Sequence, residues 1–384
     1  MPGGGGRERG APVSADPSSR SRERLVRGWS RRGAVRTLMA PLAWGYRLGL
    51  AGRRAAFRVG AFRSQEARVP VVSIGNLTVG GTGKTPATLW LADRLRADGH
   101  APAIVTRGYG GALAGRTVAV GRGGRALLPV EEIGDEAALL ATRFGGAVVC
   151  GADRVSAVEL AVDGEGADVV VLDDGFQHWR LRRDVDVVLV DGRSGFGNGA
   201  LLPAGPLREP MSAFARAHAV IVTKTAPVGA LADALRRYAG DLPLFSAELV
   251  PVGLSEWEDG ALRSRSLGDL VGRRVVTVSA IAEPRSFYEL LGQLEAQAVE
   301  VLEYPDHHFF TQSDWHRINQ AAHRADLVVC TEKDLVKLAR FPFARGRLAA
   351  LRVDFSLGEA DGERFFDLVR DRLRLRRERA IGPV

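Results

Sequence analysis

The stretch NLTVGGTGKTP, Asn76–Pro86, carries the residue types that hold a polyphosphate. Its three glycines let the backbone curl so that successive N–H groups converge on phosphate oxygens. Lys84 stands where a side chain reaches the β- and γ-phosphates, and the Thr85 hydroxyl stands where it binds Mg²⁺. An apolar run, VVSI, precedes the loop and a helical pattern follows it. We therefore predict a nucleotide site made of residues Thr78, Val79, Gly80, Gly81, Thr82, Gly83, Lys84 and Thr85.

Thr78 departs from the strict pattern, which has glycine at this position. The competing interpretation is a glycine-rich turn between a strand and a helix, with Lys84 in solvent. That interpretation leaves the motif ADVVVLDDGFQHWRLRRD unexplained, because it places two carboxylates, Asp173 and Asp174, at the end of an apolar run. One carboxylate there can bind Mg²⁺ and the other can orient water or a neighbouring ligand, as phosphoryl transfer requires. Two acids that merely cap a turn are the alternative.

The apolar runs around these motifs predict the sheet that positions them. Short β-branched runs alternate with helical segments from Val69 onward, which is typical of a parallel sheet covered on both faces. A second, shorter series of apolar runs and helical segments follows. It is flanked by extended stretches at 242–251 and 347–357 that we expect to pair as a two-stranded linker. The predicted fold class is α/β: a P-loop, three-layer α/β/α kinase-like domain plus a smaller α/β domain. The predicted segments are a disordered basic head (1–33), a membrane-interfacial amphipathic helix (34–63), the nucleotide-binding domain (64–245), the smaller domain (252–346), and a linker strand with a final helix that returns to the first domain (347–384).

The overall composition is that of a globular protein with a basic head. The chain has 384 residues, 46% of them hydrophobic, and a formal charge of +8, and nine arginines lie within its first 36 residues. Such a head suggests an acidic partner surface, either nucleic acid or anionic lipid. The two cysteines, Cys150 and Cys330, each end an apolar run and fit no metal site, which indicates buried thiols in a reducing compartment.

Residues 37–52 form an apolar run flanked by arginines, with Trp44 and Tyr46 inside it. The run is shorter than the ~20 residues needed to cross a bilayer, and no small-residue cleavage site follows it. Aromatic residues between arginines favour a helix lying in the interfacial zone of an anionic leaflet. An amphipathic helix packed on the protein's own core is the alternative.

Six further motifs occur in order along the chain: TRGYGG (106–111), GDE (134–136), DDGFQH (173–178), GNGALLPAGPLREP (197–210), PDHHFF (305–310) and CTEKDLVKL (330–338). With the phosphate loop, they resemble the tetraacyldisaccharide 4'-kinases, the lipid A 4'-kinases of Gram-negative bacteria, from about Arg36 to about Asp354. Thr78 fits this family, whose loop carries Ser or Thr there. The resemblance implies transfer of the ATP γ-phosphate, with Mg²⁺, to the 4'-hydroxyl of a tetraacylated glucosamine disaccharide 1-phosphate, giving lipid IVA. It implies a peripheral enzyme on the cytoplasmic face of the inner membrane, whose partners are the lipid substrate and the anionic membrane surface, with no nucleic acid and no obligate protein partner.

The resemblance assigns Asp135 as the catalytic aspartate and His307 as the histidine that assists it. Such a carboxylate–imidazole pair can take a proton from a sugar hydroxyl. From the residues alone, Asp135 fits the N-cap of a helix equally well, and His308 is as good a candidate as His307. Lys84 completes this part of the predicted catalytic set.

Arg208 and Glu209 follow a loop rich in glycine and proline. We predict that Arg208 braces the transferring phosphoryl group and that Glu209 joins Thr85 and the two acids as a Mg²⁺ ligand. A surface salt bridge is the competing explanation. Tyr109, in a glycine-flanked turn, and Asn198 are predicted to line the acceptor site, although Tyr109 could instead fill the core.

Gln177 and His178 come directly after the acid pair and are predicted to position nucleotide or substrate. A packed turn residue is the alternative for His178. Lys333 and Asp334 end a strand of the second domain, where they fit either domain closure or contact with nucleotide.

Two other classes of P-loop protein compete with the kinase. A switch or metallochaperone-type GTPase, acting through partner binding, would carry a guanine motif, and VTKTAP (222–227) lacks the aspartate two residues after Lys224. A nucleic-acid ATPase would explain the positive charge. Its basic residues, however, gather beside an apolar helix, with no basic groove of interleaved aromatics evident.

Overall fold

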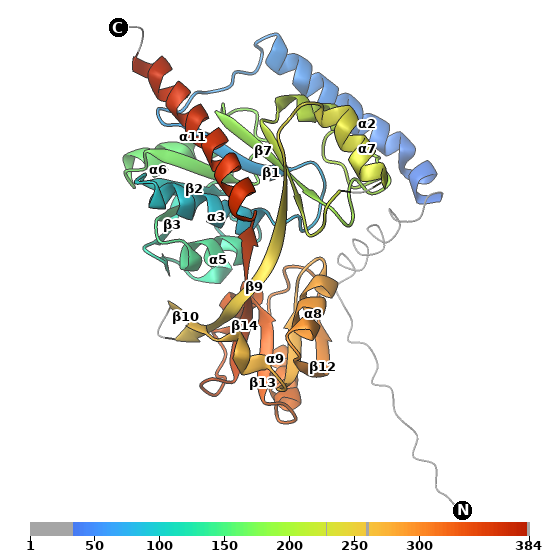
Figure 1. Cartoon of the computed structure of the whole chain (residues 1–384), viewed down its shortest axis with the longest axis vertical. Helices are drawn as coiled ribbons and strands as arrows, with labels where there is room; N and C mark the ends of the chain where they lie inside the picture. The colour runs from blue at the N-terminus through green and yellow to red at the C-terminus, as the bar shows by residue number, and fades with distance from the viewer. Residues whose placement is uncertain (1–33, 228, 259–260, 382–384) are drawn as a thin grey trace, which may run out of the picture.

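The computed structural model describes residues 34–227, 229–258 and 261–381, and the predicted basic head lies outside them. Two lobes stand one above the other, joined by long strands (Figure 1). The strands of the described residues form one sheet of 14 strands, in which β10 pairs beside β9 and the others follow the order β12-β11-β13-β14-β9-β8-β7-β1-β6-β2-β5-β3-β4. The backbone hydrogen bonds of a single sheet therefore run through both lobes.

Runs of β-branched residues form the strands of the first lobe, and five of these strands are buried at every residue. The central strands pair in parallel, as Val71 does with Val170 and Val72 with Val185. The carboxyl ends of these strands therefore meet at one edge of the sheet. The strands are β1 (Val71–Asn76), β2 (Pro102–Thr106), β3 (Val118–Arg122), β4 (Arg125–Ala126), β5 (Ala147–Cys150), β6 (Val169–Asp173), β7 (Val185–Asp191) and β8 (Ala219–Thr223).

Helices cover both faces of this part of the sheet. Leu91 of α3, Leu140 of α5 and Phe365 of α11 pack in the core on one face, and Ala157 of α6 and Leu235 of α7 pack on the other. This confirms the predicted three-layer α/β/α arrangement. The helices are α3 (Lys84–Ala97), α4 (Val130–Ile133), α5 (Asp135–Arg143), α6 (Arg154–Asp163), the 3₁₀ helix η1 (Met211–Arg216), α7 (Gly229–Ala239) and α11 (Glu359–Ile381).

The second lobe repeats the layered plan on a smaller scale. Phe287 of α8 packs in the core on one side of its strands, whereas Ile318 of α9 and Leu335 of α10 pack on the other. Its elements are β10 (Ala261–Arg265), the 3₁₀ helix η2 (Leu267–Leu270), β11 (Arg274–Ser279), α8 (Pro284–Gln293), β12 (Gln297–Glu303), α9 (Gln312–Ala322), β13 (Leu327–Thr331) and α10 (Glu332–Leu338).

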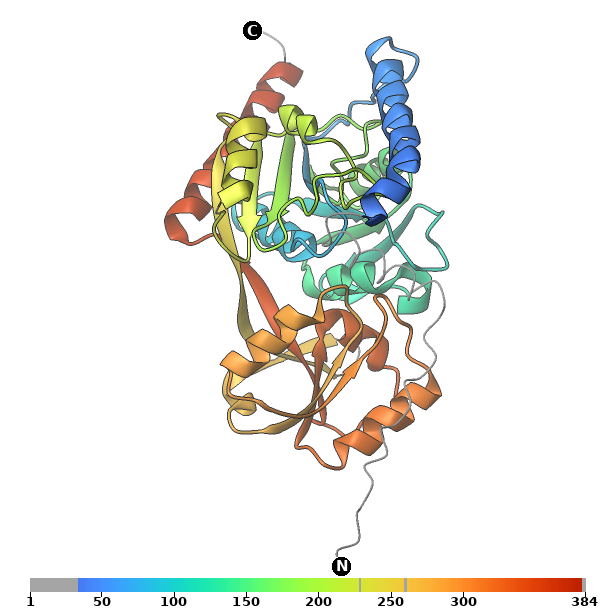
Figure 2. The same ribbon diagram turned by 90° about the vertical axis from the view of Figure 1, so that its right-hand side faces the viewer.

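Two long antiparallel strands, β9 (Leu244–Glu258) and β14 (Leu348–Ser356), connect the lobes (Figures 1 and 2). The first part of β9 also pairs in parallel with β8. The predicted two-stranded linker is thus confirmed, and it extends one sheet through both lobes. Helix α11 follows β14, and its phenylalanines return to the core of the first lobe.

Helix α2 (Ala34–Arg58) lies along the first lobe, on the side away from α11 in Figure 2. No described helix is both long enough and apolar enough to span a bilayer. Tyr46 points inward, and its hydroxyl donates to the Arg208 carbonyl at 2.8 Å. Large apolar side chains face solvent, each at least 62% exposed: Leu38, Leu42, Trp44 and Leu48. The helix therefore has one attached face and one uncovered apolar face.

Candidate active site

The predicted phosphate loop connects β1 to α3 and turns on two glycines. Gly80 has φ 126° and Gly83 has φ 81°, values that favour glycine. Asn76 Nδ2 donates to Thr82 Oγ1 at 3.1 Å, which fixes the loop to the strand before it. The N-terminus of α3 therefore opens into a curled backbone, as phosphate binding requires.

The loop that contains GNGALLPAGPLREP lies directly on the phosphate loop. Thr78 and Leu207 form a β-bridge, and the Arg208 amide donates to the Leu77 carbonyl at 2.7 Å. The Val79 amide donates to the Pro206 carbonyl at 2.9 Å. Val79 was predicted to contact nucleotide, but its N–H already has a backbone partner. The phosphate-facing amides therefore begin after it.

The two acids at the end of β6 lie beside Lys84. Asp174, which has φ 56°, accepts from Arg208 Nη1 at 2.7 Å, and its carboxylate is 3.8 Å from Lys84 Nζ. Burial alone would raise the pKa of Asp174, but the charges of Lys84 and Arg208 outweigh burial and lower it. The prediction that Lys84, Arg208 and this acid share one site agrees with these contacts.

Asp173 is almost fully buried between two hydroxyl donors. Thr88 Oγ1 lies 3.3 Å and Thr106 Oγ1 lies 3.4 Å from its carboxylate oxygens. Burial, together with the negative charges of Glu136 and Asp174, raises the pKa of Asp173 to about 6. Negative charge is therefore in excess here, and a bound cation would relieve it.

Thr85 and the acid pair suit Mg²⁺, which prefers hydroxyl, carboxylate and phosphate oxygens. Thr85 lies in the first turn of α3 and is buried. Among the described residues, no group of three or more His, Cys, Asp or Glu side chains could hold a metal by itself. Nucleotide oxygens and water would therefore complete the coordination of a metal at this position.

Glu209 and Asn198, also predicted to belong to the site, are engaged elsewhere. The Glu209 carboxylate is 3% exposed and accepts two bonds from Arg216, at 2.9 and 3.0 Å. The Asn198 amide donates to the Ala204 carbonyl at 2.9 Å and so braces its own loop. The partner of the Glu209 carboxylate in this structure is therefore Arg216, and its role as a Mg²⁺ ligand stays a prediction.

Gln177 and His178 follow the acid pair in a tight turn. Gln177 Nε2 donates to the Asn76 carbonyl at 2.9 Å, at the start of the phosphate loop. Burial, and secondarily the charge of Arg154, lowers the pKa of His178 to about 4. His178 is therefore a neutral imidazole at physiological pH, and Gln177 ties the turn to the phosphate loop.

Asp135 and His307 meet between the two lobes. His307 Nδ1 is 3.0 Å from both carboxylate oxygens of Asp135, which is 3% exposed. His308 instead contacts Asp314 at 3.0 Å, so geometry separates the two candidate histidines. Asp135 is the first residue of α5 and Gly134 is the N-cap, so the interpretation of Asp135 as an N-cap is wrong. Tyr109 lies beside the pair, with its ring centroid 5.8 Å from that of His307.

Lysines of α10 complete the contact between the lobes. Lys333 Nζ bonds Glu136 at 2.6 Å. Lys337 Nζ lies 3.3 Å from Asp135 and 3.0 Å from Asp334, and its side chain is 1% exposed. Sequence reasoning missed Lys337. The feature of the sequence that could have indicated it is the rarity of lysine, which occurs at only four positions of this arginine-rich chain.

The Asp135–His307 pair predicts how stability depends on pH. The hydrogen bond that His307 donates to the Asp135 carboxylate raises the pKa of His307 above 6.5, against the effect of burial. The contribution of protonated His307 to the free energy of unfolding is therefore fully present below about pH 6.5. It is lost as the pH rises through the raised pKa of His307. We expect His307→Gln to lose most stability, relative to the unsubstituted protein, between about pH 4 and 6.5, and less at higher pH. Urea unfolding from pH 5 to 9 measures this difference.

The control for this experiment is His316→Gln, because His316 is exposed on α9. Its stability difference should stay small and flat across the same range. A difference for His307→Gln that grows toward pH 9 would contradict protonation as the origin of the effect.

The order of strand, phosphate loop and helix, with the acid pair on the neighbouring strand, places this chain among the P-loop enzymes of phosphoryl transfer. The chain belongs to the tetraacyldisaccharide-1-P 4'-kinase family, whose model matches residues 35–374. It is 45% identical to a tetraacyldisaccharide 4'-kinase of Anaeromyxobacter dehalogenans (strain 2CP-1), over 81% of this chain and 84% of that protein. It is 36% identical to one of Halothermothrix orenii, over 77% of this chain and 81% of that protein.

A solved structure shares the fold. The crystal structure of "apo" form LpxK from Aquifex aeolicus in complex with ATP superposes with a TM-score of 0.73 at 28% identity, covering 88% of this chain and 100% of that one. Membership of a kinase family gives no support to the switch or metallochaperone alternative.

Proposed function

We propose that this chain transfers the γ-phosphate of ATP to the 4'-hydroxyl of a tetraacylated glucosamine disaccharide 1-phosphate, giving lipid IVA. The observation that carries the proposal is the Asp135–His307 pair, which forms only where the two lobes meet. The family supplies the acceptor, and the ATP-bound relative supports the nucleotide. Transfer of a phosphoryl group to an alcohol requires both a phosphate-binding loop and a base that can take the hydroxyl proton.

Each side chain has a role that its position supports. Backbone amides of Gly80–Thr85 and the Lys84 ammonium bind the β- and γ-phosphates, and Arg208 braces the phosphoryl group in transfer. Thr85, Asp173 and Asp174 would hold Mg²⁺, which neutralises charge on the phosphates when bound. Gln177 keeps the turn after the acid pair against the phosphate loop.

The transfer itself needs only one new bond and one proton acceptor. The sugar oxygen bonds to the γ-phosphorus as the bond to the β–γ bridging oxygen breaks, and ADP carries away that electron pair. The hydroxyl proton passes to the Asp135 carboxylate. The charges of His307 and Lys337 hold the pKa of Asp135 low, against the effect of burial, so it accepts the proton late, when the acceptor oxygen has become acidic.

The direct test uses γ-labelled ATP, a tetraacyl disaccharide 1-phosphate, Mg²⁺ and neutral mixed micelles. We expect label in the lipid phase, on a product that carries two phosphates. Hydrolysis of ATP with no labelled lipid would contradict the proposal and favour a P-loop protein that acts through a partner.

We also propose that the protein is peripheral on the cytoplasmic face of the inner membrane, attached through α2. The acyl chains of the acceptor stay in the leaflet, so the enzyme must reach headgroup height. The apolar face of α2 is exposed, while Tyr46 on its inner face bonds the Arg208 carbonyl. Attachment through α2 would therefore set the active site directly at the interface.

This attachment predicts that Leu38→Ser/Trp44→Ser/Leu48→Ser releases the protein from vesicles of anionic phospholipid. Each substitution removes exposed apolar area, which drives interfacial binding at ~25 cal/mol per Å². Co-sedimentation measures the bound fraction, which we expect to fall at least tenfold. The matched control is Val271→Ser/Val299→Ser/Val301→Ser, three exposed apolar side chains of the second lobe. Equal binding of both triple variants would contradict attachment through α2.

A further inference from the structure

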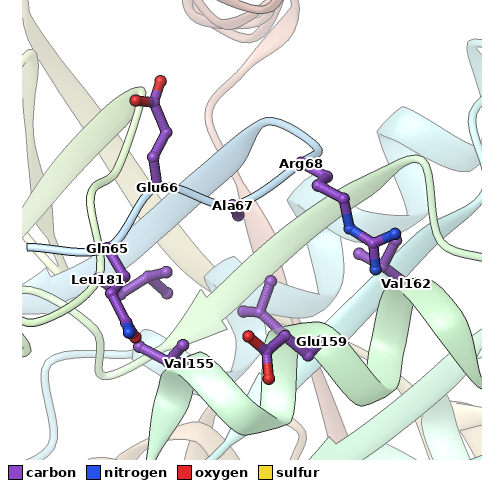
Figure 3. Close-up of a pocket in the computed structure, with 9 residues that line it drawn as sticks. Gln65, Glu66, Ala67, Arg68, Val155, Glu159, Val162 and Leu181 are labelled. Carbon is purple, nitrogen blue, oxygen red and sulfur yellow. The ribbon is translucent and has the colours of Figure 1, made fainter.

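The most deeply buried charged side chains of the described residues lie in the second lobe, away from the surface cavities. A cavity of about 250 Å³, drawn in Figure 3, is bordered by exposed charges, and Arg68 at its edge pairs with Asp163 where both side chains are more than half exposed. Such a surface pair contributes little to stability. Asp334 and Lys337 of α10, by contrast, are 0% and 1% exposed. Buried charges are costly to keep, so their partners indicate what they hold in place.

Asp334 belongs to an N-terminal cap that the chain uses twice. Thr331 caps α10, and its hydroxyl donates to the Asp334 carboxylate at 2.6 Å. Thr311 caps α9 in the same way, three residues before Asp314. The Asp314 carboxylate also accepts the Thr311 amide at 2.8 Å, which completes the capping box. The Asp334 carboxylate instead accepts the amide of Ala280 at 3.0 Å, so it serves a second segment besides its own helix.

Ala280 and Thr331 lie at a topological switch point of the second lobe. Strand β11 lies between β12 and β13 and is parallel to both, and the chain continues from β11 to β12 before it crosses to β13. Helix α8 of the first crossover and α9 of the second pack on opposite faces. Open α/β sheets bind their ligands at such a point, beyond the carboxyl ends of the strands. Here the Asp334 carboxylate lies at that point and accepts from both segments.

The first connection from Asp334 to the active site runs through side chains. Lys337 follows Asp334 by three residues on α10, and its ammonium lies 3.0 Å from Asp334 and 3.3 Å from Asp135 of the first lobe. The Phe310 ring lies 5.5 Å from the same ammonium. Lys337 therefore bridges two carboxylates from different lobes, and Asp334 fixes the end of its side chain.

The second connection from Asp334 runs through the backbone. Ala280, whose amide binds Asp334, accepts the amide of His307 on its carbonyl at 3.1 Å. His307 has φ 59°, a left-handed conformation that residues other than glycine rarely adopt. Its Nδ1 lies 3.0 Å from Asp135. The two connections therefore start at one carboxylate and end on the two members of the Asp135–His307 pair.

We propose that Asp334 is a positioning residue for phosphoryl transfer. Through Lys337 it fixes the Asp135 carboxylate, and through the backbone of Ala280 it fixes the imidazole of the pair. This inference rests on the proposed function, because it concerns the residue assigned there as the base. The Asp334 side chain is fully buried, so it acts through these neighbours and not by contact with nucleotide or acceptor. A displacement of a reacting group by about 1 Å can lower a rate by about 10²-fold.

The test is Asp334→Asn, which keeps the shape of the side chain but removes the charge that holds Lys337. We expect kcat for lipid phosphorylation to fall about 10–10²-fold, with KM for ATP and for the acceptor within about twofold of the unsubstituted protein. The matched control is Asp314→Asn, at the same position of the α9 cap. Its kcat should stay within about twofold, because the contacts of Asp314 are with Thr311 and His308. Circular dichroism checks the fold of both variants.

The titration of His307 gives a readout that needs no turnover. Charged or titratable groups face it from α5, from α10, from its own loop and from the turn after β2: Asp135, Glu136, Lys333, Asp306 and Tyr109. The bond to Asp135 raises the pKa of His307, whereas burial lowers it. In Asp334→Asn the imidazole should be held less closely against Asp135, so the pKa of His307 should fall toward 6.5. NMR of protein labelled at the histidine nitrogens measures this pKa, which should not change in Asp314→Asn.

Normal kcat in Asp334→Asn, an equal loss in Asp314→Asn, or a loss of kcat with the His307 titration unchanged would each overturn the proposal. If Asp334→Asn does not fold, Lys337→Met breaks the same side-chain connection and should lower kcat about tenfold or more without raising either KM. Normal kcat in Lys337→Met would then overturn the proposal. If the unsubstituted protein labels no lipid, the proposed function is wrong, and the His307 titration alone decides whether Asp334 positions the pair.

Discussion

Replacing Asp135 with asparagine is expected to lower kcat for lipid phosphorylation by roughly 10²–10⁴-fold, the usual contribution of a general base. Asparagine keeps the shape of the side chain, but it carries no charge and accepts no proton at physiological pH. It also ceases to stabilise a protonated His307. Steady-state kinetics with labelled ATP measures the loss, and calorimetry should show that ATP binds nearly as before.

The variant should fold, because the buried ammonium of Lys337 keeps Asp334 as a partner at 3.0 Å. Circular dichroism and Tm check this point. The matched control is Asp306→Asn, because Asp306 is 3.7 Å from the other ring nitrogen of His307 and half-exposed. It should stay within a few fold of the unsubstituted enzyme. Near-normal turnover of Asp135→Asn, or an equal loss in both variants, would contradict Asp135 as the base.

The sequence predicts best those parts of the candidate site whose residues lie close together in the chain. The phosphate loop, Lys84 and Thr85 belong to one short stretch, and the acid pair ends a strand whose position in a parallel sheet follows from its apolar run. Neighbouring strands of such a sheet bring their carboxyl ends together, so contact between Lys84 and Asp174 could be predicted from order alone.

The contacts that the residue pattern alone does not predict join segments far apart in the chain, and the pairing of Asp135 with His307 is predicted only from the family resemblance. Asp135 and His307 are 172 residues apart, and their meeting depends on how the linker strands set the second lobe. The position of Asp135 depends on Gly134, where a Cβ would lie 2.2 Å from the Tyr109 carbonyl oxygen. Likewise, only the folded chain shows that Arg216 holds Glu209. Local propensity contains none of this information.

The lobe contact explains why charged residues cluster on α10. Along this helix, Glu332 bonds Arg143 at 2.6 Å, Lys333 bonds Glu136, and Lys337 bonds Asp135. Opposite charges on α5 and α10 therefore draw the second lobe onto the helix that begins with Asp135. Lys337 and Lys333 of this contact, together with His307, also hold the pKa of Asp135 low, so the contact between the lobes sets the charge state of the proposed base.

Replacing Lys84 with alanine should lower kcat roughly 10²–10³-fold or more, the effect of removing one charged donor from a phosphoryl-transfer site. The ammonium belongs to the first residue of α3, directly after the predicted phosphate loop, and lies 3.8 Å from Asp174. Without it, Arg208 alone opposes the negative charge of the acid pair, and the pKa of Asp174 should rise. Charge developing on the bridging oxygen would then lack a counter-ion.

The matched control for Lys84→Ala is Arg96→Ala, which removes one exposed positive charge from the other end of the same helix. Its kcat should be unchanged, because solvent screens a charge that far from the phosphate loop. Both variants should keep the fold, as circular dichroism would show, since Arg208 remains as a partner of Asp174 when Lys84 is replaced and Arg96 is on the surface. Equal activity of the two proteins would mean that backbone amides and Arg208 suffice to neutralise the triphosphate, and the role of the ammonium would have to be abandoned.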